Sequence, residues 1–135
     1  MARILADTSA SYALLDRSDR NHARAVSLAR LMRRRRLTPL LTNFIVGETH
    51  GLVLSRLGSG LARRWLFGNV WPIERITADD EVRARDILRR YDDKSFSYVD
   101  ATSFSLMERL GIRQAFSFDP HRGFRDVPVM YRAHA

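Results

Sequence analysis

Four acidic side chains stand where a predicted strand, loop or helix start can present a carboxylate: Asp7, Glu48, Asp100 and Asp119. Carboxylates gathered in one pocket repel one another and take up protons unless a cation lies between them. The chain has no cysteine, and its four histidines show no paired metal-ligand spacing. An all-oxygen site of this kind suits Mg²⁺ or Mn²⁺ rather than zinc.

A hard divalent cation in a basic protein is suited to the hydrolysis of phosphodiester bonds, because the metal activates water and stabilises developing charge. The chain has a net charge of +8, and Lys94 is its only lysine. A strongly basic small domain favours polyanionic partners, nucleic acid first. The run Arg33–Arg36 has two interpretations, a solvated helix end or an electrostatic patch for RNA or a partner chain.

Each acid also has a purely structural interpretation. Asp7 could cap the helix that follows it, and Asp100 could complete a capping box with Ser97. Asp119 could be a helix cap or part of a turn, and Glu48 could be a solvent-facing helix acid. Their combination favours a shared site, because a parallel sheet brings the carboxyl ends of its strands to one crevice.

The elements that must position these acids alternate between strand and helix. Strands are predicted at residues 3–6, 38–42, 71–76, 115–118 and 127–131. Helices are predicted at residues 10–15, 22–36, 43–58, 59–67, 77–91 and 98–110. Asn43 is expected to cap the third helix, Thr77-x-x-Asp80 to form a capping box, and Gly111 to end the last helix. This alternation predicts βαβ units and a mostly parallel sheet in one domain, residues 1–135.

Composition bounds the class of protein. The 135 residues are 45% hydrophobic and 28% charged, as in a soluble globular domain. No apolar run is long enough to span a bilayer, and the start of the chain lacks the apolar region of a signal peptide. Without cysteine there is no disulfide framework, so we expect a cytoplasmic location and no membrane partner.

Four motifs occur in order along nearly the whole chain. They are Asp7-Thr8-Ser9, Thr42-Asn43-x-x-x-Gly47-Glu48, the run from Ser97 to Phe104, and Phe116-Ser117-Phe118-Asp119-Pro120-His121. With these motifs at this spacing, the chain resembles the PIN-domain ribonucleases. Within that family it is similar to the VapC-type toxins of type II toxin–antitoxin pairs.

The resemblance implies a three-layer α/β/α sandwich with a central, mostly parallel five-stranded sheet. It implies that the four acids are the catalytic residues and the ligands of Mg²⁺ or Mn²⁺. Thr8 and Ser9 match hydroxyl positions that orient the first acid or contact metal-bound water. Asp93 matches an acid often found before the third ligand, where it is a second-shell group, part of the helix approach or simply solvent-exposed.

The resemblance also implies partners. The substrate would be RNA (tRNA, rRNA or mRNA), the inhibitor a VapB-type antitoxin, and the assembly a homodimer. Apolar side chains on the middle helices could serve either protein contact or pack in the core: Leu52, Leu61, Trp65 and Leu66.

Two alternatives stand beside a toxic endoribonuclease. The first is a PIN-like module that binds RNA or protein without cutting, favoured by one departure from the family pattern. Family members continue the last acid as Asp-x-His-Phe, whereas His121 is followed here by Arg122-Gly123-Phe124. The second is a doubly wound domain of the response-regulator type. That class needs a lysine on a late strand, and Lys94 lies in a predicted loop.

Overall fold

The computed structural model describes residues 2–118, 131 and 132. Its five strands are β1 (Arg3–Ala6), β2 (Thr38–Thr42), β3 (Ile73–Glu74), β4 (Ala115–Ser117) and β5 (Tyr131–Arg132). They form one sheet in the order β3-β2-β1-β4-β5, and every neighbouring pair is parallel. The prediction of a parallel five-stranded sheet is therefore confirmed.

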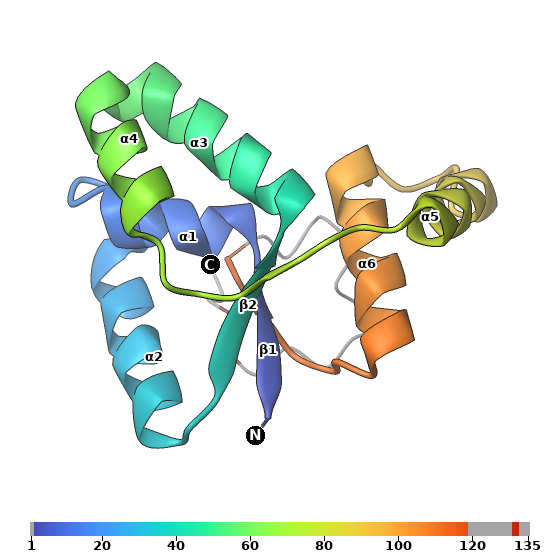
Figure 1. Ribbon diagram of the computed structural model, residues 1–135, viewed down its shortest axis with the longest axis horizontal. Helices are drawn as coiled ribbons and strands as arrows, with labels where there is room; N and C mark the ends of the chain where they lie inside the picture. The colour runs from blue at the N-terminus through green and yellow to red at the C-terminus, as the bar shows by residue number, and fades with distance from the viewer. Residues whose placement is uncertain (1, 119–130, 133–135) are drawn as a thin grey trace.

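Helices cover both faces of this sheet. They are α1 (Thr8–Leu15), α2 (His22–Arg34), α3 (Asn43–Leu57), α4 (Ser59–Gly68), α5 (Ala78–Arg90) and α6 (Tyr98–Leu110). Figure 1 shows α1 to α4 on one side of strands β1 and β2, with α5 and α6 on the other. The molecule is thus the predicted three-layer α/β/α sandwich. Among the described residues, no helix is both long and apolar enough to cross a membrane.

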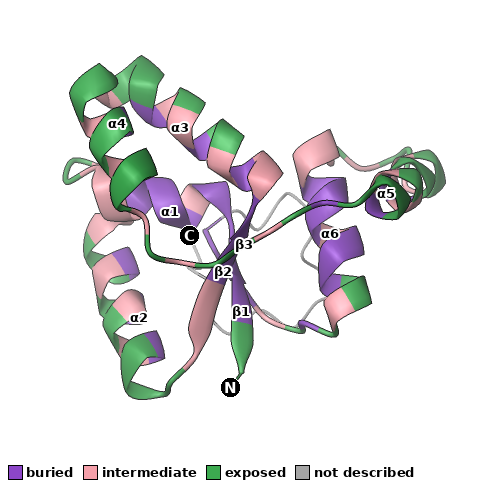
Figure 2. Ribbon diagram, viewed as in Figure 1, coloured by how far each residue is buried: buried purple, intermediate pink, exposed green. Residues whose placement is uncertain are grey.

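The core lies where β1 passes between the two helical layers. Ile4, Leu5 and Ala6 are each 0% exposed, as are Leu41 and Phe116 on the neighbouring strands. Strands covered on both faces are apolar throughout, so the run before Asp7 follows from its central place in the sheet. In Figure 2 burial is concentrated on β1, α1 and the inner face of α6, whereas α5 is largely exposed.

The cap of α3 differs from the prediction. Thr42, not Asn43, is the N-cap residue, and its Oγ1 accepts a hydrogen bond from Ile45 N at 3.0 Å. The Asn43 side chain instead accepts a hydrogen bond from Ile76 N at 2.7 Å. Asn43 therefore ties the start of α3 to the segment after β3, a long-range contact that no local cap pattern encodes.

The largest further differences in element boundaries are at α1, α2 and β3, and the others are of a single residue. Helix α1 begins at Thr8 rather than residue 10, and α2 ends at Arg34 with Arg35 as its cap. The strand predicted at 71–76 is reduced to Ile73–Glu74. In the predicted last strand, residues 127–130 lie outside the described residues. All four arginines of the Arg33–Arg36 run are exposed, as a solvated helix end requires, and a role as an RNA patch stays a prediction.

The starts of α5 and α6 and the end of α6 agree with the capping patterns predicted from the sequence. The capping boxes Thr77–Asp80 and Ser97–Asp100 are both present, with each pair making its two reciprocal hydrogen bonds. Gly111 caps α6 in the left-handed conformation at φ 67°, which only glycine adopts at low cost.

Asp80, the acid of the first capping box, also links α5 to α6. Asp80 is 3% exposed, and its two carboxylate oxygens accept hydrogen bonds from Nε and Nη2 of Arg109, both at 2.9 Å. The Arg109 guanidinium, followed by the bonds from Thr77, holds the pKa of Asp80 below its usual range. The stability from this group is therefore present above about pH 4 and lost as the pH falls towards the lowered pKa.

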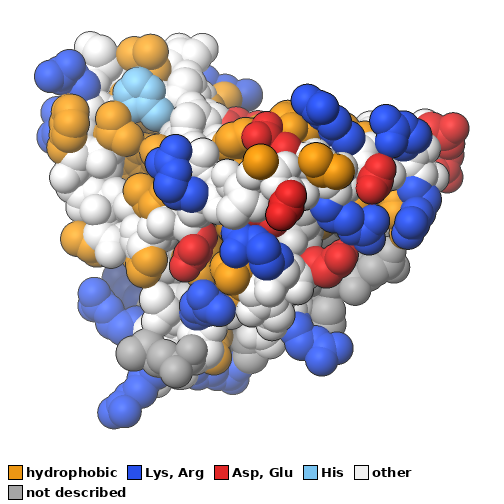
Figure 3. All heavy atoms as spheres, turned by 45° about the vertical axis from the view of Figure 1, so that its right-hand side comes forward, with side chains coloured by type: hydrophobic (Ala, Val, Ile, Leu, Met, Phe, Trp, Pro, Cys, Tyr) orange, Lys and Arg blue, Asp and Glu red, His pale blue; other side chains and the backbone are white. Residues whose placement is uncertain are grey.

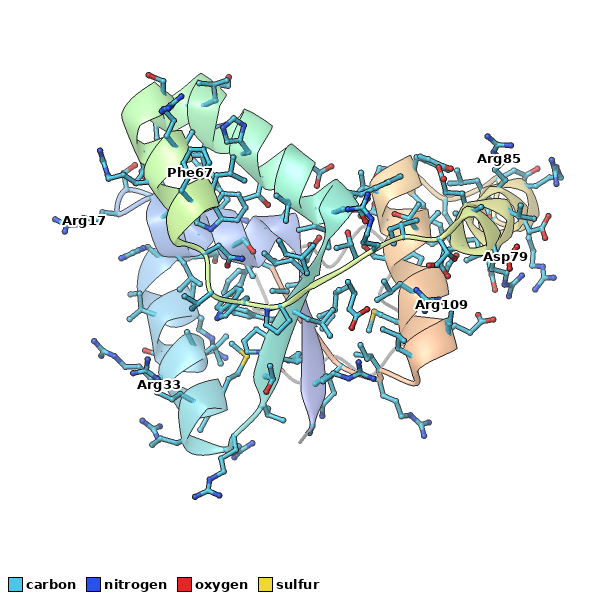
Figure 4. The ribbon with its side chains drawn as sticks, viewed as in Figure 1. Arg17, Arg33, Phe67, Asp79, Arg85 and Arg109 are labelled. Carbon is cyan, nitrogen blue, oxygen red and sulfur yellow. The ribbon has the colours of Figure 1, made fainter. Side chains whose placement is uncertain are left out.

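Replacing Asp80 with alanine is expected to lower the free energy of unfolding by about 2 kcal/mol at pH 7, because a helix cap and a charge-assisted contact are lost together. Urea unfolding at pH 7 and pH 3 measures it, and the difference from wild type should shrink at pH 3. Asp79→Ala, at an exposed acid in the same turn, is the control (Figure 4). Equal losses in the two variants would contradict this account.

Candidate active site

The first acid stands at the junction of β1 and α1. Asp7 occupies the N-cap position of α1, but its side chain makes no capping hydrogen bond. Its Oδ2 instead accepts hydrogen bonds from Ser9 Oγ at 3.0 Å and from Ser117 Oγ at 2.9 Å. The Asp7 carboxylate is therefore held by hydroxyl groups at the carboxyl end of the sheet, and the simple capping interpretation does not describe it.

Ser9 and Ser117 join the ends of β1 and β4 around this carboxylate. Ser9 Oγ accepts a hydrogen bond from Phe118 N at 3.0 Å, and Asp7 N donates to Phe116 O at 3.0 Å. Ser117 was not assigned a role from the sequence. The only sequence signal was a hydroxyl residue between two phenylalanines of a predicted strand; its contact with Asp7 follows from the pairing of β4 with β1.

Three of the four predicted acids line one open cavity of about 510 Å³. Asp7 comes from the end of β1, Glu48 from α3 and Asp100 from the first turn of α6. Asp7 and Asp100 are buried, whereas Glu48 is exposed on α3. The remaining lining residues are Thr8, Ser9, Gly51, Leu52, Ser55 and Arg56.

Two predicted site residues do not lie in this group. Asp119 falls outside the described residues. Asp93 is exposed in the turn before α6 and does not line the cavity, which agrees with solvent exposure among its three interpretations.

Asp100 both completes a capping box and lines the cavity. Its Oδ2 accepts a hydrogen bond from Ser97 N at 3.0 Å, and its own N–H donates to Ser97 Oγ at 3.0 Å. The same carboxylate faces the cavity that Asp7 lines. The capping box therefore fixes the position of the acid as well as the start of α6.

Burial disfavours the charged form of the Asp7 carboxyl group. Burial raises the pKa of Asp7 above its usual value. Hydrogen bonds from Ser117, Ser9 and the Thr8 backbone oppose this rise, and the nearby charge of Glu48 adds to it. A buried acid with a raised pKa that lines a cleft is a common feature of functional sites.

The donor chemistry fits a hard divalent cation. Within the described residues, no three acid or histidine side chains form a preassembled metal cluster. Three carboxylates nevertheless line the cavity, and the buried Thr8 Oγ1 finds no hydrogen-bond partner among the described residues. Mg²⁺ binds through one or two carboxylates and keeps several waters, and such a water would satisfy the Thr8 hydroxyl.

Replacing Ser117 with alanine is expected to raise the Mg²⁺ or Mn²⁺ concentration needed for half-maximal activity by about 10–100-fold, the usual cost of losing a group that orients a ligand. A metal titration of activity measures this. Ser105→Ala is the matched control, because Ser105 is also buried but bonds Ala101 O within α6. A Ser117→Ala variant with the metal dependence of Ser105→Ala would contradict the orienting role.

A parallel α/β/α sandwich with carboxylates at the carboxyl ends of its strands defines a class of protein, and residues 4–129 match the PIN domain family. The chain belongs to this family. It is 35% identical over 119 residues to the 23S rRNA-specific endonuclease VapC20 of Mycobacterium tuberculosis, a match covering 86% of this chain and 88% of the relative. The same identity holds for VapC20 from strain H37Rv.

The structural comparison agrees. The crystal structure of Mycobacterium tuberculosis VapC20, described as a sarcin-ricin loop cleaving toxin, matches with a TM-score of 0.76 and 34% identity. The match covers 86% of this chain and 89% of that chain. The resemblance to VapC-type toxins that the four motifs indicated is thus confirmed.

Proposed function

We propose that this protein is a metal-dependent endoribonuclease that hydrolyses a phosphodiester bond in ribosomal RNA. The observation that carries the proposal is the cavity lined by Asp7, Glu48 and Asp100. The likeness to a 23S rRNA endonuclease over most of both chains supports the choice of substrate.

In this proposal Asp7, Glu48 and Asp100, joined by Asp119, hold Mg²⁺ or Mn²⁺. The bound cation would supply an activated water and neutralise charge on the phosphate. Ser9 and Ser117 keep the Asp7 carboxylate in one orientation, so little reorganisation is needed when substrate binds. The Thr8 hydroxyl, which has no partner among the described residues, would hydrogen-bond a water or a substrate oxygen.

The partners are proposed on the same likeness. We propose a VapB-type antitoxin as inhibitor, a homodimer as the assembly, one domain over residues 1–135, and action in the cytoplasm. Exposed apolar side chains on and after α4 support a protein contact, since Phe67 is 76% and Val70 88% exposed. Figure 4 shows Phe67 on α4. Of the four apolar residues singled out in the sequence, Leu66 is exposed, and the rest are partly buried against the core.

The test is cleavage of purified 23S rRNA, and of an oligonucleotide with its sarcin–ricin loop, in Mg²⁺, in Mn²⁺ and in EDTA. We expect a discrete cut that requires either metal. Cleavage confined to tRNA or mRNA would refute the ribosomal substrate. Tight RNA binding with no cleavage in either metal would establish the non-cutting PIN-like module instead.

A further inference from the structure

On the face shown in Figure 3, surface charge alone does not mark a path for RNA. On the face shown in Figure 3, Lys and Arg side chains are spread out, with acidic side chains among them. The active-site cavity is more informative, because one arginine belongs to its lining. Arg56 is that residue, and it shares the cavity with the three acids.

Helix α3 places Arg56 at a fixed distance from the acids. Glu48, Gly51, Leu52, Ser55 and Arg56 all line the cavity, at intervals that put them on one face of a helix. Eight residues separate Glu48 from Arg56, which is about 12 Å along the helix axis. The cavity therefore has an acidic end at Asp7, Glu48 and Asp100 and a basic end at Arg56.

The strip of α3 between these two ends is open. Gly51 has no side chain, and a Cβ added there would meet none of the described residues within 4 Å. Ser55, the next residue on this face beside Arg56, is small and exposed. Among the described residues, this strip of α3 is therefore accessible to an extended chain.

Arg56 is held in place by an aromatic ring. Its Cζ lies 5.3 Å from the centroid of the Tyr12 ring, a cation–π distance. Tyr12 is itself fixed, because it is 5% exposed and its hydroxyl donates a hydrogen bond to Asp16 Oδ2. The guanidinium is therefore oriented before any ligand arrives, which lowers the entropy lost on binding.

In the part of the chain that the structure describes, Arg56 forms no ion pair, and its side chain interacts with Tyr12. The ion pairs found there join other residues: Arg3–Glu74, Arg83–Glu108, Arg89–Asp86 and Arg109–Asp80. An exposed, oriented and unpaired guanidinium at the end of a cavity is suited to an external anion. Arginine binds phosphate oxygens through its planar fork of donors.

We propose that Arg56, with the Ser55 hydroxyl beside it, binds a backbone phosphate of the RNA adjacent to the bond that is cut. The RNA strand then lies along α3, with its scissile phosphate among the acids and a neighbouring phosphate on Arg56. This inference rests on the proposed ribonuclease function and adds the direction in which the substrate enters.

The test compares Arg56→Gln with Arg63→Gln. Arg63 is the matched control, because it is also exposed and lies over an aromatic ring, Phe67, but does not line the cavity. Binding of a single-stranded RNA oligonucleotide is measured by fluorescence anisotropy over a range of salt concentrations, with both variants made on Asp7→Asn so that the RNA stays intact.

Losing one phosphate contact lowers the slope of log affinity against log salt by about 0.7, which is about fivefold in affinity at 0.1 M salt. Arg56→Gln should show this change, and Arg56→Lys should retain most of the slope. In the otherwise wild-type enzyme, Arg56→Gln should raise KM with little effect on kcat. Arg63→Gln should match its parent in both assays.

Two results would overturn the inference. If Arg56→Gln and Arg63→Gln have the same slope, Arg56 does not contact RNA and is left as a contact for a carboxylate of a partner chain. A fall in kcat with an unchanged KM and slope would also exclude a binding role. Failure of the proposed ribonuclease function would appear in a different experiment, as an absence of metal-dependent cleavage by the wild-type protein. The anisotropy experiment does not depend on cleavage, so the two failures can be told apart.

Discussion

Replacing Asp7 with asparagine is expected to lower RNA cleavage by more than about 100-fold, since loss of even an outer-shell partner of a metal ligand costs 10–100-fold. Asparagine has the same shape, and its side-chain oxygen can still accept hydrogen bonds from Ser9 and Ser117. The negative charge is removed, and the second carboxylate oxygen becomes an NH2 group, which is a poor metal ligand. Initial rates on 23S rRNA at saturating Mg²⁺ or Mn²⁺ measure the effect.

The same variant should fold at least as well as wild type. The Asp7 side chain does not cap α1, and burial raises the pKa of its carboxyl group, so a neutral amide is easier to bury than the charge. Asp79→Asn is the control, since it removes a charge from an exposed site on α5. If Asp7→Asn kept cleavage within a few fold of that control, Asp7 would not be a metal ligand.

The second large effect separates the two roles of Asp100. Asp100→Asn should also lower RNA cleavage by more than about 100-fold, because loss of a metal ligand costs more than the 10–100-fold loss seen when a group that supports a ligand is removed. It should leave α6 stable, because the amide oxygen can still accept the hydrogen bond from Ser97 N. Ser97→Ala removes the hydroxyl that accepts from Asp100 N and should cost about 1 kcal/mol of stability.

Cleavage rates at 25 °C and urea unfolding of both variants give the comparison. Asp100→Asn should be inactive and stable, and Ser97→Ala should be active and less stable. The reverse pattern, with Ser97→Ala inactive and Asp100→Asn active, would mean that Asp100 acts only through the helix cap.

The parts of this fold that could be predicted from the sequence depend on neighbours along the chain. The apolar run before Asp7 predicted a buried strand, and Ser97-x-x-Asp100 predicted a helix start. Gly111 marked a helix end for a similar reason, because its backbone conformation is strained for other residues. Such signals act within a few residues and can be recognised without the tertiary structure.

The rest depends on contacts between distant segments. Asn43 does not cap α3 because Ile76 N, 33 residues away, takes its side-chain oxygen. Ser117 reaches Asp7 across 110 residues, since β4 pairs with β1. The place of Arg56 over Tyr12 likewise depends on how α1 and α3 pack. No local pattern specifies these pairings, although the order of the four acidic motifs indicated the family.

The central claim is that the acids of this cavity share a divalent cation. Crystals of the wild-type protein and of Asp7→Asn, grown with Mn²⁺ and measured for anomalous scattering, test it most directly. We predict a Mn²⁺ peak in the wild-type cavity, in contact with the Asp7 carboxylate and bordered by Glu48 and Asp100, and its loss in Asp7→Asn. An empty wild-type cavity at a Mn²⁺ concentration that supports RNA cleavage would contradict the account.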